Sequence, residues 1–141
     1  MNIPWLWAAH LALTGYMVGV IWFVQVIHYP WLHDVPVDKF RSYHERYTRT
    51  MGWVVGPAMI GEMATGLLLL MQTTGSSTNM LAVSLVLLAL IWVSTATLQI
   101  PCHHRLSRGY DNKVHRRLVK TNWIRTVGWS LRLVLLLGYA L

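Results

Sequence analysis

Residues 80–100 read MLAVSLVLLALIWVSTATLQI, an apolar stretch without a charged side chain. The hydrocarbon core of a bilayer is about 30 Å thick, and a helix needs roughly 20 such residues to cross it. Three further long apolar stretches run from Trp5 to Ile27, from Met51 to Met71 and from Trp123 to Leu141. Only a helix satisfies the backbone of such a run internally. The sequence therefore predicts an all-α integral membrane protein, a bundle of four transmembrane helices.

The composition indicates one membrane domain over residues 1–141. Of the 141 residues, 55% are hydrophobic and only 12% are charged, too few to cover a soluble domain of this length. The net charge of +7 does not indicate a nucleic-acid partner, because the basic residues are interleaved with long apolar stretches. Membrane lipids with anionic headgroups are the partner that this charge predicts.

The positive charges also predict the orientation in the membrane. No Lys or Arg precedes the first apolar stretch or lies between the second and the third. The basic residues of the other two connections, 28–50 and 101–122, and of the start of the fourth stretch are Lys39, Arg41, Arg46, Arg49, Arg105, Arg108, Lys113, Arg116, Arg117, Lys120 and Arg125. The positive-inside rule then places both connections in the cytoplasm and both termini outside, in a cell inner (plasma) membrane crossed several times.

Each basic connection is also expected to hold a short interfacial helix. Val37–Thr50 and Asp111–Asn122 mix basic with apolar or aromatic side chains, as helices lying at a membrane surface do. Asp38 and Asp111 stand where an acidic residue would cap the start of such a helix.

A short motif occurs twice in the chain. Residues 49–53 read RTMGW and residues 125–129 read RTVGW, each at the start of an apolar stretch. Upstream, QVIH at 25–28 is matched by QIPCH at 99–103 once one residue is inserted. We favour a duplicated helical hairpin, with repeats 1–75 and 76–141 related by a pseudo-twofold axis along the membrane normal. The alternative is that Trp and Arg recur because both favour interfaces.

Polar side chains at the predicted cytoplasmic end are candidates for a cofactor site. His10, Thr14, Met17, Ile21, Gln25 and His28 are spaced by three or four residues and share one helical face. The predicted cofactor-binding residues are Gln25, His28, Gln99 and His103, and the predicted metal ligands are His28, His44, His103 and His104. Neutral imidazole ligates haem iron and transition metals such as iron, copper and zinc. The spacing matches no specific metal motif, and ordinary interfacial histidines are the alternative.

Three charged residues inside or beside the apolar stretches are candidate catalytic residues. Glu62 and Arg132 lie deep in the second and fourth stretches, and Arg125 lies just inside the fourth. An ionisable residue within a membrane needs a partner, a proton or a water-filled cavity. Glu62 would handle a proton and the arginines would hold an anionic group, or Glu62 and Arg132 would form a structural ion pair. Gly15-x-x-x-Gly19 and Gly52-x-x-x-Gly56 would serve internal packing or a homodimer.

The whole chain resembles a class of small bacterial membrane proteins with four spans, through phrases such as QVIHYP at 25–30, QIPCH at 99–103 and NWIRT at 122–126. That resemblance implies no activity and no catalytic residues. The first span, through His10 and the apolar helix that follows it, is similar to the membrane-bound protoporphyrinogen oxidase of the HemJ type. The duplicated hairpin and the histidine-rich cytoplasmic end depart from that family.

The leading functional hypothesis is a haem- or metal-dependent membrane oxidoreductase, whose site lies between the two halves near the cytoplasmic face. A small hydrophobic or anionic substrate would bind there. Two alternatives remain open at this stage: a non-enzymatic subunit that binds lipid or a partner protein, and a small dimeric transporter or channel.

Overall fold

The computed structural model describes residues 4–140, with the side chains of all of these except residues 76, 77, 139 and 140. In this part of the chain every regular element is helical. The elements are α1 (Pro4–Phe23), the π-helical turn η1 (Val24–His28), α2 (Tyr29–Trp31), the 3₁₀ turn η2 (Leu32–Asp34), α3 (Val37–Gln72), α4 (Ser76–Ser94), the π-helical turn η3 (Thr95–Gln99), α5 (Ile100–Leu106) and α6 (Asn112–Ala140). The predicted all-α class is confirmed.

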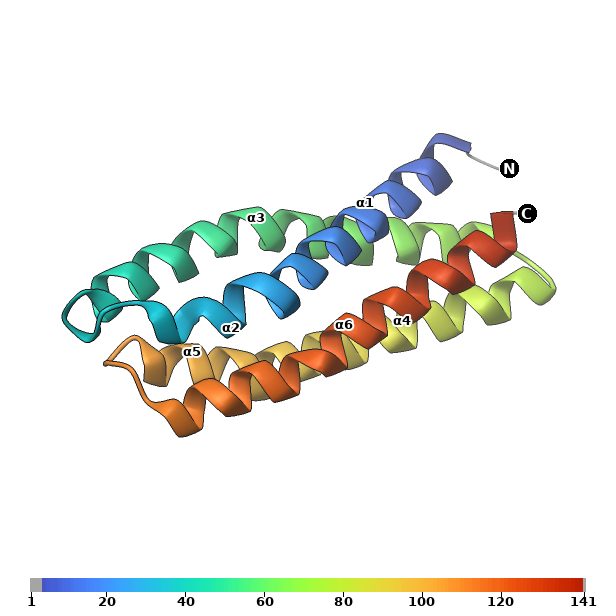
Figure 1. Cartoon of the computed structure of the whole chain (residues 1–141). Helices are drawn as coiled ribbons and strands as arrows, with labels where there is room; N and C mark the ends of the chain where they lie inside the picture. Colours follow the sequence, from blue (N-terminus) through green and yellow to red (C-terminus); the bar gives the residue numbers. More distant parts are fainter. Residues whose placement is uncertain (1–3, 141) are drawn as a thin grey trace.

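The helices form an elongated bundle in which α1 packs against α3 and α6, and α4 packs against the same two helices (Figure 1). Within residues 4–140, three stretches are long and apolar enough to cross a membrane: Pro4–Asp34, Val37–Gln72 and Thr78–Leu106. The predicted fourth span is not among them. Arg125 and Arg132 lower the hydropathy of α6, and the predicted end of that span, Leu141, lies outside the described residues.

The predicted separate interfacial helices are wrong. Residues 37–50 form the first part of α3, and residues 112–122 form the first part of α6, each continuous with the apolar helix that follows. The change from basic to apolar composition does not break the backbone hydrogen bonding of a helix. The Asp111 carboxylate caps α6 as expected, since its Oδ1 accepts hydrogen bonds from the backbone N–H groups of Lys113 and Val114 at 2.8 and 3.1 Å. Pro36 is the residue preceding α3, and Asp38 lies in its first turn.

The segments α1–η1–α2 and α4–η3–α5 form the first and third helical rods of the bundle, α3 the second and α6 the fourth. In the first and third rods a π-helical turn lies just before a proline. Pro30 and Pro101 lack a backbone N–H, and their rings crowd the carbonyl four residues earlier. In each rod the chain widens by one residue just before the proline, so that the N–H of Tyr29 reaches the carbonyl of Val24 and the N–H of Ile100 reaches that of Thr95. Such bulges are frequent at functional sites.

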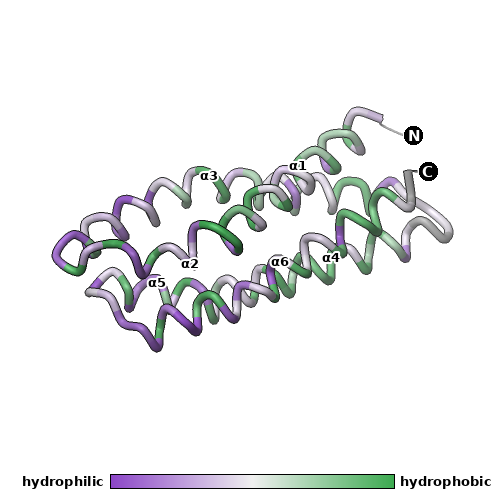
Figure 2. The backbone as a smooth tube through the Cα atoms, viewed as in Figure 1, coloured by the Kyte–Doolittle hydropathy of each residue, from purple (hydrophilic) through white to green (hydrophobic). Residues whose placement is uncertain are grey.

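Polar residues gather at the end of the bundle that holds α2, α5 and the starts of α3 and α6 (Figure 2). The opposite end holds the turn between α3 and α4, where Gly75 adopts a positive φ of 82°. All the Lys and Arg residues except Arg132 lie in the stretch 39–49 or the stretch 105–125, so the charge asymmetry expected from the sequence is present in space.

The two copies of the Arg-Thr-x-Gly-Trp motif do not have the same surroundings. Trp53 is 78% exposed, whereas Trp129 is fully buried. Arg49 is exposed and Arg125 is buried. The Arg and Trp of the first copy therefore face outward, and those of the second copy face the interior of the bundle.

Candidate functional site

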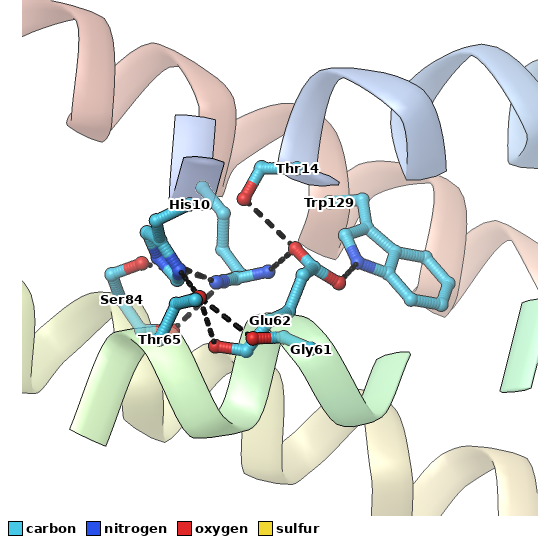
Figure 3. Close-up of polar contacts among 8 residues, drawn as sticks. His10, Thr14, Gly61, Glu62, Thr65, Ser84 and Trp129 are labelled. Atoms are coloured by element: carbon cyan, nitrogen blue, oxygen red, sulfur yellow. Dashed lines mark hydrogen bonds and ion pairs between the residues drawn. The ribbon is translucent and has the colours of Figure 1, made fainter. Parts of the chain in front are cut away.

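A closed polar network lies at the centre of the bundle, where Glu62 of α3 meets Arg132 of α6 (Figure 3). Both side chains are fully buried, and Arg132 Nη1 donates to Glu62 Oε1. The same carboxylate accepts hydrogen bonds from Thr14 Oγ1 at 2.8 Å and from Trp129 Nε1 at 2.9 Å. Glu62 thus has three donors from two other helices.

The remaining donors of Arg132 are directed at α4 and α1. Its Nε donates to the backbone oxygen of Ser84 at 3.0 Å, and its Nη2 lies 3.5 Å from His10 Nε2. The other ring nitrogen of His10 pairs with Thr65 Oγ1 at 2.8 Å. The network joins all four long helices and leaves its two charged groups paired, which supports the ion-pair interpretation of Glu62 and Arg132 over the catalytic one.

A cavity of about 400 Å³ lies between this network and the basic end of the bundle. Its lining comes from α1, η1, α2, α3, η3, α5 and α6. The lining residues are Met17, Val20, Ile21, Val24, Tyr29, Tyr47, Thr48, Met51, Gly52, Val55, Thr95, Gln99, Ile100, His103, His104, Ser107 and Arg125. The walls are mostly apolar toward the centre of the bundle and carry polar groups toward its basic end. Size and lining are those of a site for a small organic molecule.

Arg125 is the one Lys or Arg among the lining residues, and it has no acidic partner. All five acidic residues of the chain lie in its described part: Glu62 binds Arg132, Glu45 binds Arg41, Asp34 binds His33, Asp111 caps α6, and Asp38 lies at the start of α3. Arg125 is 6% exposed, and its guanidinium carbon lies 5.4 Å from the centre of the Trp129 ring. Its Nη1 donates to Asn122 Oδ1 at 3.3 Å, and its buried Nε has no partner among the described residues.

Most other hydrogen-bond donors of the cavity wall are already used. The hydroxyls of Thr48, Thr95 and Ser107 each donate to a backbone carbonyl four residues earlier in the chain. The amide of Gln99 pairs with Ser94 and Thr121. Neither the hydroxyl of Tyr47 nor the ring of His104 makes a hydrogen bond to any described residue, so both are available to a ligand together with Arg125 Nε.

The histidines gather near the cavity but do not form a metal centre. His103 uses both ring nitrogens, one with the Tyr29 hydroxyl at 2.8 Å and one with His44 Nε2 at 3.3 Å. His28 stacks on Tyr47, with 3.8 Å between the ring centres. Within the described residues there is no group of three or more His, Cys, Asp or Glu side chains that could hold a metal ion. The predicted ligand set of His28, His44, His103 and His104 is therefore not assembled around one point.

The two glutamines both face the interior, as the repeat predicts, but each bonds to α6. Gln25 Oε1 accepts from Asn122 Nδ2 at 2.8 Å, and Gln25 Nε2 donates to the backbone oxygen of Val119. Gln99 Nε2 donates to Thr121 Oγ1 at 3.3 Å. Of this pair only Gln99 lines the cavity.

Of the predicted site residues, Gln99, His103, His104 and Arg125 line the cavity, and Gln25, His28, His44, Glu62 and Arg132 do not. Tyr29 and Tyr47 line it and were missed as site residues. The signal for Tyr47 was available, since Tyr47, Met51 and Val55 follow the three-to-four spacing of one helical face.

Comparison of the chain with protein-family models, with curated proteins and with solved structures found no match. The resemblances drawn from short sequence phrases therefore stay predictions.

Proposed function

We propose that this chain is a multi-pass membrane protein that binds a small amphipathic molecule in the cavity beside Arg125. One observation carries the proposal: a buried guanidinium without an acidic partner lines a largely apolar cavity. A buried charge without a partner is costly, and the cost falls when a bound group supplies the missing acceptor. The apolar walls formed by Met17, Ile21 and Val24 would hold the body of the same molecule.

In the proposed arrangement α6 crosses the bilayer with the other three rods, making four spans in two tandem hairpins. Its two arginines are compatible with this, because Arg132 is paired with Glu62 and Arg125 lies toward the basic end. The basic end would face the cytoplasm and both termini the outside of an inner membrane. An alkaline phosphatase fused after Leu141 should be active, and one fused after Gly109 inactive; the reverse pattern would contradict this orientation.

Native mass spectrometry of the full chain, released from detergent micelles, tests the binding. Wild-type protein should retain a small molecule that the Arg125→Met variant loses. Arg116→Met removes an exposed arginine of the same helix and serves as the control, which should retain it. Equal retention by wild type and Arg125→Met, or no retained molecule in either, would count against the proposal.

Haem or metal binding for membrane redox chemistry remains the second candidate. His28 Nε2 and His44 Nδ1 are buried and have no hydrogen-bond partner among the described residues, and such nitrogens are available to ligate a metal. The visible spectrum and the metal content of the purified protein test it. A Soret band, or stoichiometric iron, copper or zinc that His44→Ala abolishes, would support this candidate. A featureless visible spectrum, together with the absence of bound metal, would contradict haem or metal binding.

The two other hypotheses, an assembly subunit and a dimeric transporter or channel, stay predictions. A Cβ placed on Gly15, Gly19, Gly52 or Gly56 would meet no other atom within 4 Å. These glycines therefore serve no close internal helix contact, and a homodimer through the face of Gly15 and Gly19 stays a prediction.

A further inference from the structure

We propose that the molecule bound in the cavity is a single-chain amphiphile with one carboxylate, such as a long-chain fatty acid, and that it enters sideways from the lipid between α3 and α5. This inference rests on the proposed function and specifies the ligand class and its route. Three observations lead to it: the charge of the cavity, its shape, and the position of its opening.

The charge of the cavity favours a group with a single negative charge. Arg125 is the one Lys or Arg in the lining, and the lining contains no Asp or Glu. An ionised carboxylate carries one negative charge and balances one guanidinium, and the guanidinium in turn favours the ionised form. A phosphate monoester carries about −1.5 to −2 and would leave negative charge uncompensated. A neutral alcohol or quinone would leave the positive charge of Arg125 without a counter-charge. A quaternary ammonium group would have no Asp or Glu in the lining to pair with.

Two of the unused donors of the wall suit a carboxylate in particular. Arg125 Nε is a buried donor without a partner among the described residues, and the hydroxyl of Tyr47, in the same lining, makes no hydrogen bond to them. A carboxylate accepts at two oxygens, and hydrogen bonds from a guanidinium to it are among the stronger ones in proteins. Asn122 holds the Nη1 side of Arg125, so the guanidinium is oriented before the ligand arrives.

The shape of the cavity suits a chain. The first rod lines it from Met17 to Tyr29, a rise of about 18 Å at 1.5 Å per residue. The lining of the deeper part is aliphatic or thioether: Met17, Val20, Ile21, Val24, Met51 and Val55. An apolar lining that extends along the first rod in this way can hold an unbranched hydrocarbon tail directed toward the centre of the bundle.

The opening lies where a membrane-resident amphiphile keeps its headgroup. Three lining residues are also exposed on the outside of the bundle: Gly52 on α3, and Ile100 and His104 on α5. Met51 begins the second apolar stretch and Ile100 ends the third, so the opening is at the boundary between hydrocarbon and headgroups. A Cβ on Gly52 would meet open space, and the missing side chain leaves this opening wide.

Photolabelling of the full-length protein in phosphatidylcholine vesicles tests the proposal. The probes are a diazirine-bearing hexadecanoic acid and the hexadecanol that carries the same diazirine. The acid should label wild-type protein at least about tenfold more than the alcohol, because only the acid gains the charge-assisted bonds. The labelled peptides should contain residues 17–24 or 51–55. Unlabelled hexadecanoic acid should compete.

Two leucine variants test the route. Gly52→Leu fills the opening and should reduce labelling by the acid severalfold. Gly19→Leu is the matched control, since Gly19 also has open space around its Cβ but does not line the cavity, and it should label as wild type does. Circular dichroism and gel filtration confirm that each variant is folded before its result is read.

The outcomes separate this inference from the proposed function. Saturable labelling of the cavity peptides to equal extents by acid and alcohol would overturn the carboxylate class and leave amphiphile binding intact. Unchanged labelling in Gly52→Leu would overturn the lateral route. Absence of saturable labelling by both probes, in a folded wild-type protein, would overturn both the inference and the proposed function.

Discussion

Arg125 and Arg132 lie about two turns apart on α6, are both buried, and have opposite surroundings. Arg132 reaches a carboxylate, a backbone carbonyl and an imidazole. Arg125 donates to one amide oxygen, interacts with Tyr29 and Trp129, and keeps Nε unpaired beside a cavity. The difference teaches that burial of a charge does not define a site. A buried arginine that is fully paired joins helices, whereas one with an unused donor at a cavity wall can still accept a partner, as the proposed function requires.

The largest expected loss of stability comes from removing Arg132, the arginine that is paired with Glu62. Arg132→Met should destabilise the folded bundle by about 3–5 kcal/mol, because it leaves the Glu62 carboxylate buried without its counter-ion. Chemical unfolding in micelles, followed by circular dichroism, measures this loss. The double variant Glu62→Gln/Arg132→Met should recover much of it, since neither side chain then carries a charge. A single variant as stable as wild type would contradict the structural role of this ion pair.

Trp129 lies between the two arginines in sequence, and its indole N–H donates to Glu62. Removing this N–H measures how much the hydrogen bond contributes to stability. Trp129→Phe removes the N–H that Glu62 accepts at 2.9 Å, and a hydrogen bond to a charged group contributes about 1.5–3 kcal/mol. The unfolding free energy should fall by that amount. Trp53→Phe changes the matching residue of the first motif, which is 78% exposed, and should shift the unfolding free energy by less than about 0.5 kcal/mol. Equal losses would contradict the assigned burial.

Gly52 and Gly128, the glycines of the two motifs, test the same difference in burial between the first motif and the second. A Cβ at Gly128 would lie 2.9 Å from Ile91 Cγ1, and overpacking of this kind costs about 1–3 kcal/mol. Gly128→Ala should therefore destabilise the bundle, as measured by the same unfolding experiment. Gly52→Ala meets open space and should cause no loss. If Gly52→Ala proved the more damaging, the first motif would face a helix that the structure does not place there.

The smallest change in stability is expected at the unpaired arginine. Arg125→Met should alter the unfolding free energy by less than about 1 kcal/mol, or raise it, because it removes a buried charge that has no acidic partner. The same variant should lose the retained small molecule in native mass spectrometry. A destabilisation as large as that of Arg132→Met, measured on protein without bound ligand, would remove the distinction between the two arginines.

The fold was predictable where hydropathy alone decides it. The apolar stretches at 5–27, 51–71 and 80–100 are helical throughout, because a long apolar run leaves the backbone no other means of internal hydrogen bonding. Where helices begin was not predictable in this way. α3 starts at Val37, well before the apolar stretch that starts at Met51, since hydropathy reports the surrounding solvent and not the hydrogen bonding of the backbone.

The site was predictable only in part, and the π turns explain one miss. The stripe of His10, Thr14 and Gln25 is buried as a regular helix requires. His28 is the next step of that stripe, but the extra residue of η1 rotates the chain there. Tyr29 takes the inner position, 2% exposed, and lines the cavity instead. Proline in a helix predicts a local distortion, and the sequence alone does not specify a widened turn.

The pairing of Glu62 with Arg132 also bears on how the chain is made. The two residues are separated by 70 positions, so in the proposed four-span arrangement the carboxylate leaves the ribosome and enters the bilayer long before its partner exists. α6 is less apolar than the earlier helices, and its arginine gains a counter-ion only when it joins them. Insertion of the last helix is then driven by the ones already in place, and a nascent chain truncated before α6 would present an orphan acid to the quality-control proteases of the membrane.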